Sequence, residues 1–280
     1  MDNLINNLID LAFTEDIGEG DHTTLCSIPE NAIGKASLVI KEAGILAGVD
    51  VAIKVFHKLN SQLKIDVLIK DGSSVNPGDI VFTVEGKVQS ILQAERIMLN
   101  IMQRMSGVAT ATNRYVALIA GTGAKVLDTR KTTPNMRPFE KYAVKVGGGT
   151  NHRYNLSDGV LIKDNHIGAA GSITNAIKLC KEYAPFVRKI EVEVENLEML
   201  KEALEAGADI IMLDNMDNDT MRKAVLMVDG KAETECSGNV VKERLKEIAE
   251  IGVDFVSCGA LTHSAPIMDL SLKNLVPVSK

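Results

Sequence analysis

Positively charged side chains gather in one stretch of the sequence, residues 125–163. This stretch holds eight basic and three acidic residues, a net charge of +5, whereas the whole chain of 280 residues carries −6. Lys141 and Lys145 have the spacing of a solvated helix face. The remaining candidates follow strand-like runs or lie in loops: Arg130, Lys131, Arg153 and Lys163. Arginine makes paired hydrogen bonds to carboxylate or phosphate, and lysine acts as a point charge. The stretch therefore predicts a binding site for anions.

Neighbouring residues extend this predicted site. Thr129 directly precedes Arg130, and His152 next to Arg153 can add a hydrogen-bond donor, although a lone histidine is more often structural. The run Gly147–Gly149 cannot be helical, and we expect it to form a flexible loop that carries His152 and Arg153 over the site. A plain connector is the alternative for this glycine run.

Two carboxylates, Glu193 and Asp214, lie at the ends of two further strand-like runs. In an anion site they could hold Mg²⁺ together with substrate phosphates, or accept hydrogen bonds from ribose hydroxyls. Glu191 and Glu195 share a face with Glu193 by the period of two, and burying three acids without partners is costly. For these two, exposure at the strand end or pairing with lysines is the alternative.

Small residues follow the last two strand-like runs, in Ser237-Gly238-Asn239 and Gly259-Ala260-Leu261. Such loops let backbone N–H groups approach an anion, and the last loops of α/β barrels often hold a phosphate. Either loop alone could be a simple turn. The two together favour a phosphate site.

The elements that must position these residues are short apolar strands that alternate with helices after residue 124. We expect strands near 125–127, 160–162, 190–194, 210–213, 232–235 and 253–257, with helices near 136–147, 171–184, 196–206, 217–228 and 240–250. This alternation predicts parallel strands with right-handed crossovers, closed or nearly closed into an α/β barrel. An open doubly wound sheet is the alternative. In a barrel, the residues after each strand form the active site.

The first part of the chain has an α+β pattern. We expect helices at 2–13 and 48–59, a polar turn at 15–24, and strands near 35–42, 63–69 and 79–85. A long helix begins near 89, is interrupted at Ser106-Gly107 and resumes to about 120. The expected domains are 1–107 and 108–266.

Composition excludes several classes of protein. The net charge of −6, the absence of Trp and the 4% aromatic content argue against nucleic-acid binding. No apolar run reaches the ~18 residues of a membrane span. The first residues lack the features of a signal peptide, which predicts a cytoplasmic location. The cysteines form no CxxC pair that would indicate zinc: Cys26, Cys180, Cys236 and Cys258.

Taken together, these motifs closely resemble those of the quinolinate phosphoribosyltransferase family. The most specific block comprises Asp128–Pro134, Glu140–Val144, Gly147–Gly149, Asn151–Arg153 and Leu161–His166. The resemblance extends over essentially the whole chain through Glu15–Thr24, Glu95-Arg96, Leu99-Asn100, Ser106-Gly107, Leu213–Asn215 and Ser237–Asn239.

The resemblance implies an α+β N-terminal domain joined to an incomplete α/β barrel of parallel strands. The tail, 267–280, is implied to pack back on the first domain, with Asp269–Leu275 as an added strand. Members of the family are dimers or larger, in which one arginine enters the partner's site. Arg96 matches that arginine.

The implied reaction transfers phosphoribosyl from 5-phosphoribosyl-1-pyrophosphate to quinolinate, with Mg²⁺, and yields nicotinate mononucleotide, pyrophosphate and CO2. The residues implied to bind quinolinate are Arg96, Arg130, Lys131, His152, Arg153 and Lys163, with Thr129 beside them. Glu193 and Asp214 are implied to bind the ribose hydroxyls and the metal. The loops Ser237–Asn239 and Gly259–Leu261 are implied to bind the 5′-phosphate. Lys131, Lys163, Glu193 and Asp214 are implied to take part in catalysis.

Two alternatives remain at this point. One is a paralogue of the same fold, either a phosphoribosyltransferase that acts on another pyridine acid or the related protein of molybdate-transport operons. The other is a non-catalytic protein that binds a phosphorylated sugar. The retained cations disfavour the first, and the retained carboxylates Glu193 and Asp214 disfavour the second.

Overall fold

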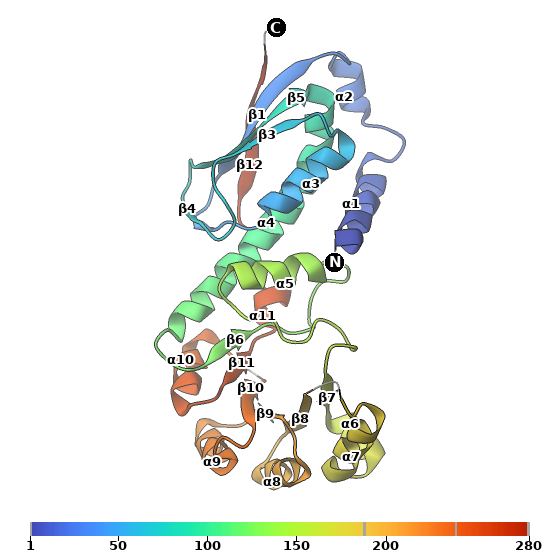
Figure 1. The fold of residues 1–280 in the computed structure, drawn as a ribbon. Helices are drawn as coiled ribbons and strands as arrows, with labels where there is room; N and C mark the ends of the chain where they lie inside the picture. Colours follow the sequence, from blue (N-terminus) through green and yellow to red (C-terminus); the bar gives the residue numbers. More distant parts are fainter. Residues whose placement is uncertain (1, 187–188, 239, 279–280) are drawn as a thin grey trace. The chain divides into compact units, whose positions relative to one another are not determined.

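The computed structural model describes residues 2–186, 189–238 and 240–278, and they divide into two compact units. Unit 1 comprises the described parts of 1–113, 133–148 and 264–280, and unit 2 comprises those of 114–132 and 149–263. The expected junction at residue 107 lies within helix α4 (Val88–Leu118). Figure 1 shows the elements of both units.

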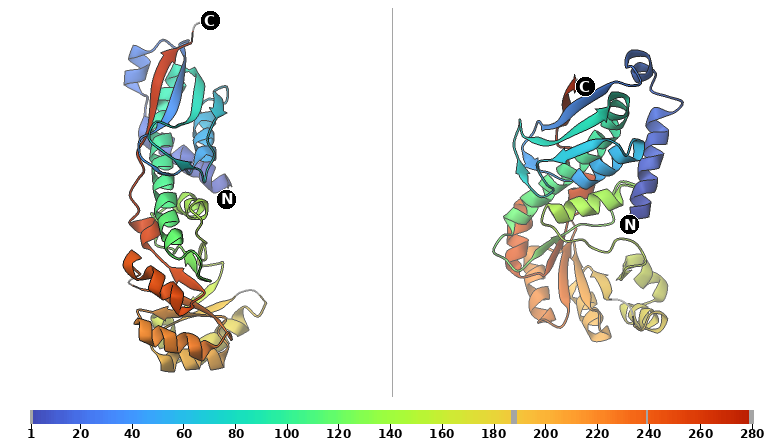
Figure 2. Two further views of the ribbon diagram at one scale, coloured as in Figure 1. Left: turned by 90° about the vertical axis from the view of Figure 1, so that its left-hand side faces the viewer. Right: turned by 45° about the horizontal axis from the view of Figure 1, so that its top comes forward.

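Unit 1 is built on an antiparallel sheet with the strand order β12-β1-β5-β3. These strands are β1 (Ile33–Ile40), β3 (Lys64–Val67), β5 (Ile80–Lys87) and β12 (Leu270–Pro277). The C-terminal strand β12 lies beside β1, as both views in Figure 2 show, and pairs with it from Gly34↔Pro277 to Ile40↔Leu270. The tail of the chain thus forms the edge of the N-terminal sheet.

Helix α3 (Val49–Leu59) packs on this sheet through one apolar stripe. Its buried residues Val51, Ala52, Val55 and Phe56 recur at helical spacing. Phe56 meets Phe82 of β5 edge to face, with 6.1 Å between ring centroids. Alternate residues of β1 are buried, as expected for a sheet with one face on a core.

Helix α4 is continuous, so the expected interruption at Ser106-Gly107 is wrong. Both residues serve packing inside unit 1. A Cβ on Gly107 would lie 1.9 Å from the carbonyl oxygen of Pro266, so only glycine allows this approach. The buried Ser106 hydroxyl bonds to both the N–H and the C=O of Ala47, at 3.0 and 3.1 Å.

The remaining elements of unit 1 include one helix that the sequence pattern does not indicate. They are α1 (Asp2–Ile17), α2 (His22–Ser27), β2 (Gly44–Ile45), β4 (Ser74–Val75) and α5 (Arg137–Val146). The segment expected as a turn at 15–24 instead holds the end of α1 and the start of α2. Asp21 caps α2 by accepting the N–H of Thr24 at 3.0 Å, which also lowers the pKa of Asp21.

Unit 2 is an incomplete barrel of parallel strands with the order β6-β11-β10-β9-β8-β7. The strands are β6 (Lys125–Leu127), β7 (Val160–Ile162), β8 (Ile190–Val194), β9 (Ile210–Asp214), β10 (Glu233–Ser237) and β11 (Phe255–Ser257). A doubly wound sheet reverses its strand order midway. Here β7 to β11 follow each other without reversal and β6 joins β11, so the barrel prediction is confirmed over the described strands.

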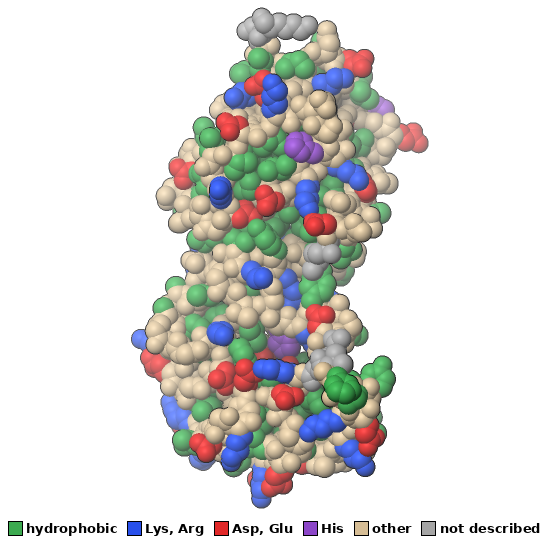
Figure 3. Space-filling view, in the orientation of Figure 1, with side chains coloured by type: hydrophobic (Ala, Val, Ile, Leu, Met, Phe, Trp, Pro, Cys, Tyr) green, Lys and Arg blue, Asp and Glu red, His purple; other side chains and the backbone are tan. Residues whose placement is uncertain are grey.

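Successive strands from β7 to β11 are connected by the helices α6 (Asp164–Ala170), α7 (Ile173–Tyr183), α8 (Leu197–Ala206), α9 (Asn218–Val228) and α10 (Lys242–Ile251), and α11 (Ala260–His263) follows β11. Ser172, Asn196 and Asp217 begin three of them, because each side chain accepts a backbone N–H three residues on. On the face seen in Figure 3, acidic and basic side chains intermingle. None of the described helices is long and apolar enough to cross a membrane.

Candidate active site

A cavity of about 680 Å³ lies at the carboxyl ends of the unit 2 strands. It collects ten of the predicted site residues: Thr129, Arg130, Lys131, His152, Arg153, Lys163, Glu193, Asp214, Ser237 and Gly238. It is completed by residues that were not predicted as site residues: Leu161, Met212, Asn215, Glu235 and Ser257. The strand ends therefore bring the predicted cations and carboxylates to one place.

The turn after β6 is fixed from two sides. Thr129 Oγ1 accepts the N–H of Lys131 at 3.0 Å. The carbonyl oxygen of Lys131 accepts the hydroxyl of the buried Thr262, at 2.9 Å. These bonds set the backbone, and the long side chains of Arg130 and Lys131 extend from it into the cavity.

The segment that carries His152 and Arg153 was expected to be a flexible loop, but hydrogen bonds hold it in place. Thr150 exchanges backbone hydrogen bonds with Val126 and Asp128, at 2.9 and 3.1 Å. The carboxylate of Asp128, which is fully buried, accepts the N–H of His152 and the side-chain amide of Asn151, at 2.8 and 2.6 Å. Asp128 thus positions the cations without lining the cavity.

Arg130 and Arg153 are close enough for their charges to interact. Burial and the neighbouring Arg130 charge lower the pKa of Arg153. Arg153 Nη1 also donates to the carbonyl oxygen of Gly159 at 3.0 Å, which fixes its guanidinium. Two guanidiniums gathered at one wall are stabilised when an anion binds between them.

The cavity lining also holds an ion pair between neighbouring strand ends. Lys163 follows β7 and its ammonium group pairs with the carboxylate of Glu193 on β8. The backbone N–H of Lys163 donates to His166 Nδ1 at 3.0 Å, at the start of α6. Glu193 is half-buried and Glu195 is exposed, so of the two only Glu193 belongs to the site.

Asp214 and the loop after β10 form one hydrogen-bonded group. Asn215 donates its side-chain amide to Asp214 Oδ2 at 2.7 Å and its N–H to the carbonyl of Ser237 at 3.0 Å. Gly238 has φ +81°, and a Cβ there would meet the Asn215 side chain at 2.3 Å. Only glycine fits this position. Asn239, the third predicted residue of this loop, lies outside the described residues.

The other predicted phosphate loop lies against Lys131. A Cβ on Gly259 would come 3.1 Å from Lys131 Cδ. Ala260 and Leu261 begin the short helix α11, and Leu261 is fully buried, so its backbone alone could meet a ligand. Arg96 is exposed on α4, in unit 1, and is not among the residues of the cavity.

Three titratable side chains meet at the floor of the cavity: His152, Glu191 and Glu235. His152 Nε2 lies 3.1 Å from Glu191 Oε2 and 3.6 Å from Glu235 Oε2. Two alternatives were expected for Glu191, exposure at the strand end or pairing with a lysine, and both are wrong. Glu191 is buried and its partner is His152. Glu235 shares its strand face with Ser237 by the period of two, a signal that could have placed it in the site.

These three residues do not fit a metal site, although their ligand atoms all lie within 4.8 Å of one another. His152 Nδ1 accepts the N–H of Arg153 at 2.7 Å, so the ring proton lies on Nε2. A metal at Nε2 would require that proton to leave and would give a charged imidazolate. The accepted N–H therefore assigns His152 as a neutral donor to the carboxylates.

Glu193 and Asp214, by contrast, fit Mg²⁺. Both are half-buried carboxylates on the cavity wall, and such oxygen donors suit a hard cation that also binds substrate phosphates.

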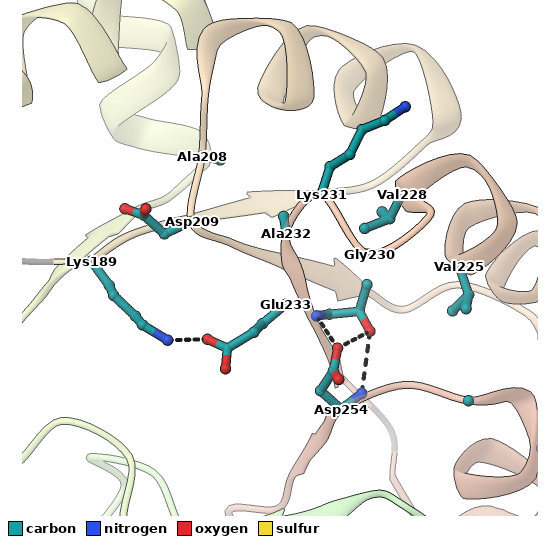
Figure 4. Close-up of a pocket in the computed structure, with 12 residues that line it drawn as sticks. Lys189, Ala208, Asp209, Val225, Val228, Gly230, Lys231, Ala232, Glu233 and Asp254 are labelled. Carbon is teal, nitrogen blue, oxygen red and sulfur yellow. Dashed lines mark hydrogen bonds and ion pairs between the residues drawn. The ribbon is translucent and has the colours of Figure 1, made fainter.

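A second pocket lies at the opposite, amino-terminal ends of the strands (Figure 4). The acidic side chains of this pocket form hydrogen bonds and ion pairs with neighbouring strands. Asp209 accepts the N–H of Ile190 at 2.7 Å, and Asp254 accepts the N–H and hydroxyl of Thr234 at 2.7 and 2.9 Å. Lys189 pairs with Glu233. This end of the barrel therefore serves stability, as is usual for such folds.

The fold and cavity define an incomplete α/β-barrel protein whose strands carry a cavity lined by arginine and lysine side chains at their carboxyl ends. Two family models match the chain: Quinolinate phosphoribosyl transferase, N-terminal domain, at residues 21–106, and Quinolinate phosphoribosyl transferase, C-terminal domain, at residues 108–273. The chain belongs to the quinolinate phosphoribosyl transferase family.

Individual relatives cover nearly the whole chain. The probable nicotinate-nucleotide pyrophosphorylase [carboxylating] of Bacillus subtilis is 41% identical, over 96% of this chain and 92% of its own. The chloroplastic nicotinate-nucleotide pyrophosphorylase [carboxylating] of Arabidopsis thaliana is 44% identical, over 95% of this chain and 81% of its own. The crystal structure of NadC from Streptococcus pyogenes superposes with a TM-score of 0.96 at 43% identity, covering 100% of this chain and 99% of that one. These matches confirm the expected fold class.

Proposed function

We propose that this enzyme transfers phosphoribosyl from 5-phosphoribosyl-1-pyrophosphate to quinolinate, and releases nicotinate mononucleotide, pyrophosphate and CO2. This is a step of de novo NAD biosynthesis. The observation that carries the proposal is the gathering of Arg130, Lys131, Arg153 and Lys163 around one cavity, facing the carboxylates Glu193 and Asp214. Relatives named as carboxylating pyrophosphorylases support it.

Quinolinate carries two carboxylates, and the guanidiniums of Arg130 and Arg153 suit them. Both side chains line the cavity, and the fixed guanidinium of Arg153 loses little freedom when a ligand binds. Lys131 and Lys163 add point charges. The ring N–H of His152 is donated to carboxylates of the protein, so the role of His152 is to complete the cavity wall beside Arg153.

Glu193 and Asp214 would hold the ribose and Mg²⁺. When bound, Mg²⁺ neutralises charge that develops on the departing pyrophosphate. The ribose hydroxyls can donate to the two carboxylates. Lys163, paired with Glu193, orients that carboxylate.

The 5′-phosphate is assigned to the loops Ser237-Gly238 and Gly259-Ala260-Leu261. Glycine at both positions lets the backbone approach closely, and Ser237 adds a hydroxyl. Lys131 lies beside Gly259 and can reach the same phosphate.

The reaction requires positioning and charge stabilisation rather than a nucleophilic side chain. Loss of pyrophosphate gives the ribose oxocarbenium character, which Glu193 and Asp214 stabilise. The pyridine nitrogen then attacks C1 of the ribose. The resulting pyridinium withdraws electrons, so the carboxylate on the adjacent carbon leaves as CO2.

The active form is proposed to be a homodimer or larger, with Arg96 in the neighbouring subunit's site. Arg96 matches the arginine that enters the partner's site in the family, and its exposure on α4 leaves its side chain accessible to a neighbouring subunit. A cytoplasmic location is part of the proposal, because the four cysteines are free thiols, as in a reducing compartment.

The proposal is tested by supplying quinolinate, nicotinate and nicotinamide separately, each with 5-phosphoribosyl-1-pyrophosphate and Mg²⁺, and measuring pyrophosphate. We expect release with quinolinate alone. Release with nicotinate but not quinolinate would overturn the proposal and would indicate a paralogous activity.

A further inference from the structure

Glu235 is a buried carboxyl group that the function described above does not use. It lies on β10 at the floor of the cavity, and is 1% exposed. Its Oε1 has no hydrogen-bond partner among the described residues. Burying an ionised carboxylate with an unsatisfied oxygen costs much more free energy than burying the protonated form.

The groups that face Glu235 come from each neighbouring element. They are Glu191 on β8, Lys163 after β7, His152 in the segment after β6, and Ser257 on β11. Burial and, next, the charge of Glu191 raise the pKa of Glu235 to about 7, although His152, Ser257 and Lys163 oppose this. A substantial share of Glu235 therefore carries a proton at neutral pH.

The proposed reaction needs a proton donor in this cavity. When CO2 leaves, the bond between the ring carbon and the carboxylate breaks and its electron pair stays on the ring carbon. We propose that Glu235 is the acid that protonates this carbon. The new C–H bond takes the proton from the carboxyl oxygen, whose O–H electron pair remains on Glu235 as a carboxylate. Water then restores the proton. This inference depends on the proposed function.

The other acids and bases of the cavity have different partners. Lys163 is paired with Glu193, and the ring proton of His152 is directed to Glu191 and Glu235. Glu193 and Asp214 are assigned to the ribose. Glu235 is the described cavity carboxyl that combines burial, an unsatisfied oxygen and a raised pKa, so it is the group prepared to donate a proton.

The experiment is a single-turnover rapid quench with Glu235→Gln, which keeps the shape but has no acidic proton. Pyrophosphate and nicotinate mononucleotide are measured in the same samples. We expect pyrophosphate to form close to the wild-type rate, nicotinate mononucleotide to form about 100-fold more slowly, and the dicarboxylated nucleotide to accumulate. An equal fall in both products, or no fall, would overturn the inference.

Two control variants sharpen this result. Glu235→Asp keeps a carboxylic acid and is expected to recover part of the second step. Glu195→Gln alters an exposed acid directly after β8 that does not line the cavity, and is expected to leave no excess of pyrophosphate over nicotinate mononucleotide.

The pH dependence gives an independent test on the wild-type enzyme. The rate of nicotinate mononucleotide formation should fall as pH rises above about 7, because Glu235 loses its proton. The rate of pyrophosphate formation should not show this fall. This measurement decides the question even if the glutamine variant does not fold. A single pH profile for both products would contradict the inference. If the wild type forms no pyrophosphate from quinolinate, the proposed function fails first.

Discussion

The carboxylate of Asp128 accepts the backbone N–H of His152, with 2.8 Å between Asp128 Oδ1 and the nitrogen. Its other oxygen accepts the amide of Asn151 at 2.6 Å. The first residue after β6 thereby fixes the segment that presents Arg153. The geometry of the anion site depends on a buried acid that contacts no ligand in the proposed scheme.

Asp128→Ala should therefore weaken quinolinate binding. Loss of these two hydrogen bonds to a charged acceptor, each worth roughly 1.5–3 kcal/mol, frees the segment from its anchor on Asp128. We expect a Kd for quinolinate raised at least about 10-fold and a lower Tm. Calorimetry and thermal unfolding measure the two effects. Asp158→Ala is the matched control, because Asp158 accepts the N–H of Tyr154 at 2.7 Å but is exposed. Equal effects of both substitutions would contradict this role.

Arg130→Ala should separate the two substrates. The side chain is assigned to quinolinate, so its removal should weaken quinolinate binding by about 10- to 100-fold, as expected for a charge-assisted hydrogen bond. Binding of 5-phosphoribosyl-1-pyrophosphate should change little. Titration calorimetry with each substrate tests this, with Lys145→Ala on an exposed helix face as the control. Equal losses for both substrates would refute the division of the site.

Glu235 should make stability depend on pH in a defined direction. Its pKa is raised from 4.5 to about 7, so the folded state keeps a proton that the unfolded state has lost. The stability associated with that proton is full below pH about 4.5 and is lost as pH rises through about 7. Relative to wild type, Glu235→Gln should thus gain in Tm between pH 5 and pH 8. Glu233→Gln, which alters an ion pair with Lys189, should not show this gain. If Tm varies with pH in the same way for Glu235→Gln and wild type, the predicted ionisation of Glu235 is excluded.

Arg96 is predicted to act in the neighbouring subunit. Arg96→Ala and Lys163→Ala should each be inactive alone, because each removes one part of every site. In mixed dimers, one site combines the intact Lys163 of its own chain with the intact Arg96 of the other. Refolded or exchanged mixtures should therefore regain a fraction of wild-type activity. Mixtures that stay inactive, with mixed dimers verified by mass spectrometry, would count against a role in trans.

The barrel and most of the cavity were predictable because local signals define them. Each parallel strand is a short apolar run, and the residues after it form the site whatever the details of packing. Arg130, Lys163 and Asp214 could be placed on this basis. Resemblance to the family supplied the assignment of Arg96, since nothing local distinguishes it from other helix-surface charges.

Other features depend on how distant segments meet, which a single sequence does not express. Ser106 and Gly107 suggest a broken helix until the backbone of Ala47 and Pro266 is seen beside them. In the sequence, Asp128 resembles any acid in a loop. In the structure it is fully buried and accepts hydrogen bonds from Asn151 and His152. The period of two could have placed Glu235 in the site, but its contact with His152 depends on how the segment after β6 meets β10.

The most direct test of the account uses quinolinate labelled in the carboxylate next to the ring nitrogen. Wild-type enzyme is mixed with the labelled compound and Mg²⁺, with and without 5-phosphoribosyl-1-pyrophosphate, and CO2 and pyrophosphate are counted together. We predict one labelled CO2 for each pyrophosphate, and no labelled CO2 when 5-phosphoribosyl-1-pyrophosphate is omitted. Pyrophosphate without labelled CO2, or CO2 that does not require the phosphoribosyl donor, would contradict it.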